Sequence, residues 1–103
     1  MNKSWVYILE CSDKSYYVGC TTNLEQRFAE HQEGKYKGYT STRLPVKLVW
    51  SEEFTDVRYA AELERQLKGW SRKKKVALIQ GDFNLIHELA QSIEMKERRE
   101  KRK

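Results

Sequence analysis

Two runs of β-branched and aromatic residues, separated by only four turn-forming residues, constrain the fold of this chain more than any other feature. Residues 5–11 (Trp-Val-Tyr-Ile-Leu-Glu-Cys) and 16–20 (Tyr-Tyr-Val-Gly-Cys) have the composition of strands. Residues 12–15 (Ser-Asp-Lys-Ser) have the composition of a turn. Because so short a connection joins only antiparallel neighbours, we expect these two runs to form a β-hairpin.

The length of the hairpin loop decides whether the two central tyrosines meet. A loop of two or four residues would place Tyr7 and Tyr17 on opposite faces of the sheet. A three-residue loop over 13–15, with a bulge, would place them on the same face. The sequence permits either arrangement.

The rest of the chain alternates helical patterns with one more strand. Thr22 or Asn23 can cap the first helix, and Asp56 and Ser71 can cap the next two. The predicted elements are, in order, a helix over 23–33, a polar loop over 34–45, a strand over 46–54, and helices over 56–69, 72–80 and 84–93.

This order predicts an α/β chain of the α+β type: a small three-stranded antiparallel sheet flanked by helices, in the order β-β-α-β-α-α-α. Hydrophobic residues make up 39% of the 103 positions, which suffices for one modest core and not for a second. No run approaches the roughly 18 apolar residues of a membrane span, and we expect no secretory signal. Cys11 and Cys20 fit neither a zinc spacing nor a disulfide framework, so we expect reduced thiols in a cytoplasmic protein.

The net charge of +5 is unevenly spread. Residues 96–103 carry six bases and two acids, a charge of +4. Six further bases crowd, without an acid, into residues 65–75: Arg65, Lys68, Arg72, Lys73, Lys74 and Lys75. Such a patch suits a polyanionic partner such as nucleic acid. The alternative interpretation is a solvated helix face and a frayed tail.

Two places combine polar chemistry with an apolar face. Arg27 and His31 are four residues apart on the first predicted helix and share a face, which we expect to lie near the sheet. The alternative interpretation is a surface arginine and a satisfied, partly buried histidine. On the second predicted helix, Glu64 borders the apolar stripe, whereas Glu62 is expected to point to water. A border carboxylate needs a partner, either Lys68 one turn on or a metal ion.

The order of these residues resembles the GIY-YIG nuclease family, in particular its small stand-alone bacterial domains. The resemblance covers about residues 4–90 and rests on Val6-Tyr7-Ile8, Tyr17-Val18-Gly19, Arg27, His31, Glu64, Lys68-Gly69-Trp70-Ser71-Arg72, Lys75, Leu78-Ile79, Asn84 and Leu89. The chain also departs from the family pattern at Trp5, Lys14, Val18, Leu85 and Ile86. Lys14 stands where a turn glycine is common, so strain at a positive φ is expected there.

The resemblance implies roles for specific residues. The implied catalytic residues are Tyr7, Tyr17, Arg27, His31 and Glu64, with Glu64 also the ligand of Mg²⁺ or Mn²⁺. Mg²⁺ prefers oxygen ligands and keeps several waters, so one carboxylate suffices. Gly19 is implied as a structural residue, at a position where a side chain would crowd the site, and Asn84 is implied as a structural residue near the metal. We expect the basic run and the polar loop to bind nucleic acid through Lys68, Arg72, Lys73, Lys74, Lys75, Tyr36 and Tyr39.

The predicted protein is therefore a nuclease domain over residues 1–92 followed by a charged, disordered tail over 93–103. We expect a metal-dependent endonuclease that hydrolyses phosphodiester bonds in DNA, selective for structured or single-stranded substrates, in repair or recombination. One alternative is a catalytically inactive nucleic-acid-binding module. Another is an interaction domain whose basic tail docks on an acidic protein.

Overall fold

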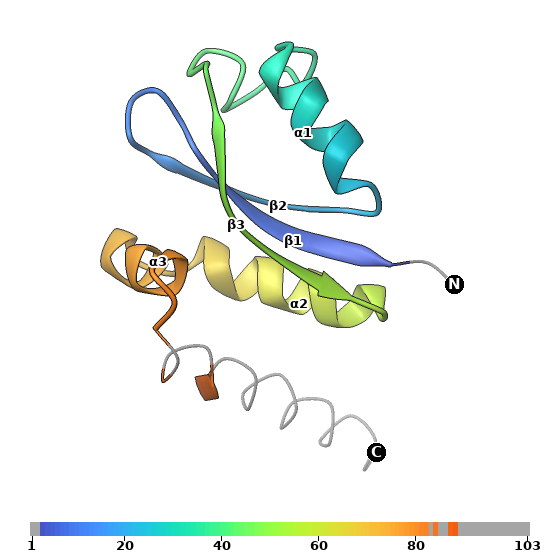
Figure 1. Ribbon diagram of the computed structural model, residues 1–103, viewed down its shortest axis with the longest axis vertical. Coiled ribbons are helices and arrows are strands. Elements are labelled where there is room, and N and C mark those ends of the chain that lie inside the picture. The colour runs from blue at the N-terminus through green and yellow to red at the C-terminus, as the bar shows by residue number, and fades with distance from the viewer. Residues whose placement is uncertain (1–2, 83, 85–86, 89–103) are drawn as a thin grey trace.

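The computed structural model of the chain describes residues 3–82, 84, 87 and 88 (Figure 1). Its elements are β1 (Ser4–Glu10), β2 (Tyr16–Thr21), α1 (Leu24–Gln32), β3 (Lys47–Phe54), α2 (Val57–Lys68) and α3 (Arg72–Ile79). The α+β fold class and the order of these six elements confirm the prediction. Asn84, His87 and Glu88 are helical; the remainder of the predicted helix over 84–93, and the predicted tail over 93–103, lie outside the described residues.

The three strands form an antiparallel sheet in the order β2-β1-β3, so β2 is an edge strand. In the hairpin register Tyr7 lies opposite Gly19, and Leu9 lies opposite Tyr17. Because side chains alternate along a strand, Tyr7 and Tyr17 share one face of the sheet. The sequence left this point open, and the register settles it.

The hairpin loop contains three residues and lies one position earlier than the three-residue alternative over 13–15. The Cys11 amide donates to the Ser15 carbonyl at 2.9 Å, so residues 12–14 form the loop. Lys14 has φ of 70°, the left-handed conformation expected where a glycine would be common.

Each helix begins where a side chain can accept a hydrogen bond from an otherwise unpaired backbone N–H. Asn23 accepts from the Gln26 amide at 3.1 Å and begins α1. Asp56 and Ser71 perform the same role for α2 and α3. The predicted caps are therefore confirmed, with Asn23 rather than Thr22 at the first helix.

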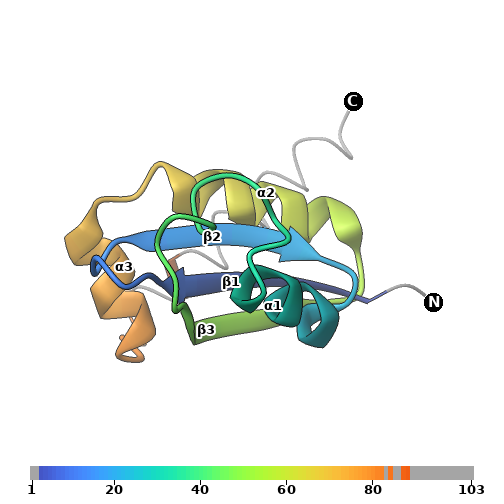
Figure 2. The ribbon, with the colours of Figure 1, turned by 90° about the horizontal axis from the view of Figure 1, so that it is seen from above.

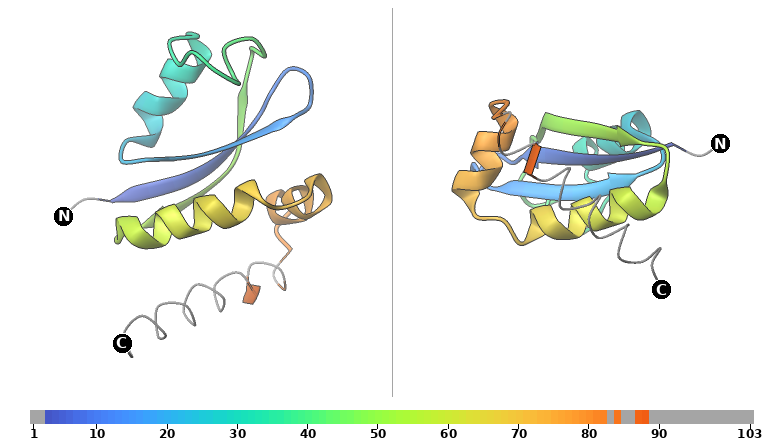
Figure 3. Two further views of the ribbon diagram at one scale, coloured as in Figure 1. Left: turned by 180° about the vertical axis from the view of Figure 1, so that it is seen from behind. Right: turned by 90° about the horizontal axis from the view of Figure 1, so that it is seen from below.

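Both faces of the sheet are covered, which corrects the expectation of a single core. Figures 1 and 3 show α1 on one side of the sheet and α2 and α3 on the other. Val6 and Ile8 pack in the cluster under α2, whereas Tyr7 and Leu9 pack in the cluster under α1. Since β1 is the central strand, its alternate residues pack in the two clusters in turn. The short chain therefore has two thin hydrophobic layers, one on each face of the sheet, rather than one thick core.

α2 packs against both β1 and β2, and seen from above in Figure 2 it lies toward the β2 side of the sheet. This position brings side chains of α2 to the same sheet edge as those of β2. Both cysteines are free, Cys11 buried and Cys20 half-buried. Among the described residues, no helix combines the length and the apolar character that crossing a bilayer requires.

Candidate active site

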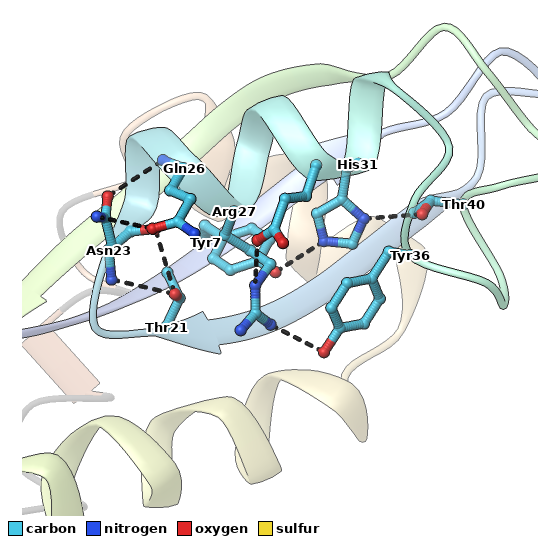
Figure 4. A network of polar contacts seen from close by, with 9 residues as sticks. Tyr7, Thr21, Asn23, Gln26, Arg27, His31, Tyr36 and Thr40 are labelled. Carbon is cyan, nitrogen blue, oxygen red and sulfur yellow. Dashed lines mark hydrogen bonds and ion pairs between the residues drawn. The ribbon is translucent and has the colours of Figure 1, made fainter.

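A buried chain of polar contacts crosses the layer between β1 and α1 (Figure 4). The Tyr7 hydroxyl lies 3.0 Å from Nε2 of His31. Nδ1 of the same ring lies 2.8 Å from Oγ1 of Thr40. Tyr7 and Thr40 are each 1% exposed and His31 is fully buried. The prediction that His31 lies on the sheet-facing side of its helix is confirmed.

Gly19 makes room for the Tyr7 ring. A Cβ atom at this position would lie 2.4 Å from both Cζ and the hydroxyl oxygen of Tyr7. No real Cβ contact is this short, so any other residue would displace the phenol from His31. The expectation that a side chain at Gly19 would crowd the site agrees with this geometry.

Tyr17 lies in the same aromatic group. Its ring centroid is 6.4 Å from that of Tyr7 and 5.2 Å from that of His31. On its other side the Tyr39 ring lies 6.3 Å away at an interplanar angle of 26°. The two tyrosines of the hairpin thus converge on one histidine from neighbouring strands, beside the loop that follows α1.

Arg27 lies one turn before His31 on α1, and its guanidinium contacts Tyr36 and Glu30. Nη1 donates to the Tyr36 hydroxyl at 2.9 Å, and Nε lies 3.6 Å from a carboxylate oxygen of Glu30. The Tyr36 ring lies beneath the guanidinium at 4.7 Å and also beside His31, with centroids 4.9 Å apart. Tyr36 therefore links the predicted catalytic arginine to the predicted catalytic histidine.

Arg43 fixes the loop that carries Tyr39 and Thr40, a role that the sequence did not suggest. Its Nε donates to Asp13 in the hairpin turn at 3.0 Å, and its Nη1 donates to the Tyr39 carbonyl at 2.8 Å. Its guanidinium also covers the Tyr39 ring at 3.9 Å. The loop is thus tied to the hairpin, which keeps Tyr39 beside Tyr17.

Burial keeps the Tyr7–His31 pair neutral. It raises the pKa of Tyr7, with a further contribution from Tyr17, whereas Arg27 opposes the rise. Burial also lowers the pKa of His31, and the nearby Arg27 charge lowers it further. At neutral pH, Tyr7 is a protonated phenol and His31 is a neutral imidazole with one nitrogen free to accept.

Glu64 comes from α2, on the opposite face of the sheet, yet its charge affects the side chains of the same edge strand, β2. The pKa of Tyr17 is raised chiefly by burial and also by the Glu64 charge, while Arg27 opposes the rise. The pKa of Cys20, which lies in the same edge strand, is likewise raised chiefly by burial and also by the Glu64 charge. Arg27 again opposes the rise. Glu64 and Arg27 thus approach β2 from opposite faces.

The two glutamates of α2 differ from the prediction in part. Glu64 is half-buried at the border of the apolar stripe, as expected, and Lys68 Nζ lies 3.8 Å from its carboxylate. The prediction that Glu62 points to water is wrong: its side chain is 18% exposed and accepts from Arg65 at 2.7 Å. The position of Glu62 around the helix predicts the direction of its side chain, but it does not predict that the contact with Arg65 covers part of that side chain.

No group of three or more His, Cys, Asp or Glu side chains is arranged to hold a metal ion in the part of the chain that the structure describes. A Mg²⁺ ion bound mainly by waters and phosphate oxygens needs no such group. The Glu64 carboxylate suits that role, because its side chain is 26% exposed and its ion pair with Lys68 is long at 3.8 Å. The donor set therefore fits a hard divalent cation held by one protein ligand.

The predicted nucleic-acid-binding residues fall into two groups. Tyr36 and Tyr39 are exposed, at 39% and 42%, beside the aromatic group around His31. The bases of α3 form the other group: Arg72, Lys73 and Lys74 are exposed, and Lys75 is half-buried. Lys68 belongs to neither, because it pairs with Glu64.

Arg72 connects α3 to the hairpin. It donates to the Lys14 carbonyl in the turn, and its guanidinium lies 4.8 Å from the Tyr16 ring. The basic surface of α3 is thereby fixed next to the strand that carries Tyr17. Asn84 is exposed, and its expected place near the metal stays a prediction.

The sequence does not predict the contact of Thr40 with His31 either. It lies in an irregular loop with Thr42 close by, and no spacing distinguishes one threonine from the other. Only the packing of that loop against α1 places Thr40 on the histidine ring.

Comparison with known proteins gives matches over most of the chain. Residues 3–77 match the family model of the GIY-YIG catalytic domain. A UPF0213 protein of Syntrophus aciditrophicus is 49% identical over 80 residues, which cover 77% of this chain and 92% of that protein. The UPF0213 protein YsiG of Lactococcus lactis is 42% identical over 100 residues, covering 96% and 95% of the two chains.

Two solved structures have a similar fold. The solution NMR structure of a UPF0213 protein from Bacillus halodurans has a TM-score of 0.52 at 40% identity, over 76% of this chain and 83% of that one. The solution NMR structure of a protein from E. faecalis has a TM-score of 0.55 at 33% identity, over 78% and 85% of the two chains.

Proposed function

The chain belongs to the GIY-YIG catalytic domain family, and we propose that it is a metal-dependent endonuclease that hydrolyses phosphodiester bonds in DNA. The observation that carries the proposal is the 3.0 Å contact between the Tyr7 hydroxyl and His31 Nε2, with Tyr17 and Arg27 beside it. A buried phenol in contact with a neutral imidazole is suited to moving a proton. Mere binding of nucleic acid needs no such pair.

Tyr7 and His31 together supply the base of the reaction. As a water molecule attacks phosphorus, Tyr7 takes the water proton and passes its own hydroxyl proton to Nε2 of His31. The phosphorus–oxygen bond to the leaving group breaks, and the leaving oxygen takes a proton from solvent. Tyr17, in contact with both rings, helps to position the attacking water.

Arg27 binds the phosphate. A guanidinium offers two parallel donors that match two phosphoryl oxygens and offset the charge that develops on them. In the free protein the Tyr36 hydroxyl accepts from Nη1 at 2.9 Å. Substrate binding would therefore move Tyr36 aside and replace its oxygen with a phosphoryl oxygen.

Glu64 would hold the divalent cation, Mg²⁺ or Mn²⁺. When bound, the cation supplies charge neutralisation at the phosphate and stabilises the leaving oxygen. Glu64 would position the cation from α2, on the face of the sheet opposite to that of Arg27. Release of Lys68 from its 3.8 Å ion pair would leave that ammonium free to contact the DNA backbone.

The surroundings of the site favour unpaired nucleotides. Tyr36 and Tyr39 present exposed aromatic rings, and unpaired bases stack on such rings. The bases of α3 would hold the sugar-phosphate backbone. We therefore propose single-stranded or branched DNA as substrate, in repair or recombination, and a cytoplasmic location in keeping with the free cysteines.

An inactive nucleic-acid-binding module is the alternative, supported by the same basic surface on α3. It leaves the buried contacts of Tyr7, His31 and Thr40 without a role, although buried polar groups are costly to maintain. The two functions differ in how they depend on Glu64: a binding module would not need it, whereas a nuclease would lose cleavage without it.

The test is incubation with Mg²⁺ or Mn²⁺ and labelled single-stranded, flapped and duplex DNA of matched sequence. Arg27→Ala and Glu64→Ala serve as the site variants. Metal-dependent cleavage that both variants lose supports the proposal. Absence of cleavage of every substrate with either metal would contradict it.

A further inference from the structure

We propose that Thr40 is a positioning residue that holds His31 in the tautomer with hydrogen on Nδ1, so that Nε2 faces Tyr7 as an acceptor. The contribution of Thr40 to catalysis rests on the proposed nuclease function. The tautomer itself is a property of the free protein, and it can be measured without any cleavage.

The geometry leaves His31 two hydrogen-bonding partners, one at each ring nitrogen. Tyr7 lies 3.0 Å from Nε2 and Thr40 lies 2.8 Å from Nδ1. Neutral imidazole has one donor and one acceptor nitrogen. The partner at Nδ1 therefore determines what Nε2 offers to Tyr7.

Two directions of donation fit these distances. In the first, Tyr7 donates to Nε2 and Nδ1–H donates to Thr40. In the second, Thr40 donates to Nδ1 and Nε2–H donates to Tyr7. A phenol is a stronger donor than an aliphatic alcohol and a weaker acceptor, since its oxygen lone pair is shared with the ring. The first direction gives each oxygen the role it performs better.

The surroundings of the ring favour the same arrangement. Groups facing His31 include the phenols Tyr7, Tyr17 and Tyr36, the cation Arg27 and the carboxylate Glu30. Burial and Arg27 keep the imidazole neutral, so it retains an acceptor nitrogen. Of the two hydroxyls in contact with the ring, the phenol at Nε2 is the better donor and the alcohol at Nδ1 is the better acceptor.

Thr40 is itself held in place. It is 1% exposed, and its carbonyl accepts from the Arg43 amide at 3.0 Å. Arg43 in turn binds Asp13 of the hairpin. The Thr40 oxygen is therefore presented to His31 by a fixed loop, without help from solvent.

In the reaction the Tyr7 O–H bond breaks and an N–H bond forms at Nε2 of His31. The resulting imidazolium keeps its Nδ1–H bond to Thr40, which stabilises the new positive charge. Tyr7 regains a proton from the attacking water. After product release the proton at Nε2 returns to solvent, so that no proton is gained or lost by the site over one cycle.

The experiment compares wild type with Thr40→Val and Thr40→Ser, where serine keeps the hydroxyl. Side-chain ¹⁵N shifts of His31 distinguish a protonated nitrogen from a free one, and His87→Gln removes the other histidine signal. Wild type and Thr40→Ser should have hydrogen on Nδ1. Thr40→Val should lose this preference, and its kcat should fall on the order of tenfold with KM little changed; Thr40→Ser should restore kcat.

A wild-type His31 with hydrogen on Nε2 would overturn the proposal without any variant, whether or not the protein cleaves DNA. Unchanged kcat in folded Thr40→Val would also overturn it. The Nδ1–H tautomer in a protein that cleaves no DNA would support the tautomer assignment and remove its catalytic role, which is the failure of the proposed function alone.

Discussion

The Tyr7 hydroxyl and Nε2 of His31 lie 3.0 Å apart in a buried layer between β1 and α1. The two residues come from different elements and are 24 positions apart in sequence. Their contact depends on the hairpin register, on the capped start of α1 and on Gly19. It is therefore a sensitive point at which to test both the fold and the proposed chemistry.

Removing the Tyr7 hydroxyl should abolish most of the activity and preserve the fold. Tyr7→Phe keeps the ring in the cluster under α1 and loses one hydrogen bond, worth about 1 kcal/mol. We expect kcat for DNA cleavage to fall about 10²–10⁴-fold, the usual contribution of a general base. Tyr16→Phe is the matched control, because Tyr16 packs on the other face of the sheet; equal losses in both variants would contradict the role of Tyr7.

Adding one methyl group at Gly19 should displace Tyr7. Gly19→Ala would place a carbon 2.4 Å from the phenol, so we expect destabilisation of about 1–3 kcal/mol together with loss of cleavage. Gly69→Ala is the control, because its Cβ would meet nothing closer than 3.5 Å. Urea unfolding and the cleavage assay measure both effects. A Gly19→Ala protein as stable and active as wild type would show that the phenol can move freely.

Acid should destabilise the protein through His31. Its folded-state pKa lies below the ordinary 6.5, so near and below that pH the unfolded chain binds more protons than the folded one. The free energy of unfolding should therefore fall as pH falls from 7 through 6.5 toward 5. His31→Gln should flatten this part of the profile relative to wild type. Equal slopes in His31→Gln and wild type would contradict the burial of a neutral imidazole.

Loss of Arg43 should weaken DNA binding more than it weakens the fold. Arg43→Ala removes the partly exposed ion pair with Asp13, whose contribution to stability is weakened by solvent screening, and releases Tyr39. Because base stacking contributes about 1–3 kcal/mol per base, affinity for single-stranded DNA should fall at least severalfold in fluorescence anisotropy. Arg58→Ala, which removes an exposed arginine, controls for charge; an equal loss there would assign the effect to charge alone.

Local features of the sequence predicted most of the fold. Caps at Asn23, Asp56 and Ser71 and the strand composition of the hairpin depend on neighbours only a few residues away. The hairpin register did not follow from them, because three- and four-residue loops fit the same turn residues equally well. The composition did not predict the division of the core between the two faces of the sheet. Composition gives the amount of apolar surface, but not how that surface is distributed between the two faces.

In the candidate site, the sequence predicted the helical and strand residues and the two loop tyrosines, but not the loop residues that hold them in place. Periodicity placed His31 toward the sheet and Glu64 at the border of the apolar stripe. Thr40 and Arg43 lie in a loop, where no period relates sequence to direction. Their roles depend on contacts with residues far along the chain, Asp13 above all, and these contacts form only when the loop packs on the hairpin.

The most direct test of the account measures cleavage and binding of one labelled single-stranded DNA by wild type and by Glu64→Gln, in Mg²⁺, at equal protein concentration. Glutamine keeps the size of the side chain and removes its charge. If Glu64 holds the metal ion, Glu64→Gln should bind the DNA at least as tightly as wild type and cleave it more slowly by about 10²-fold or more. Equal cleavage by the two proteins, or cleavage by wild type that persists in excess EDTA, would contradict this role.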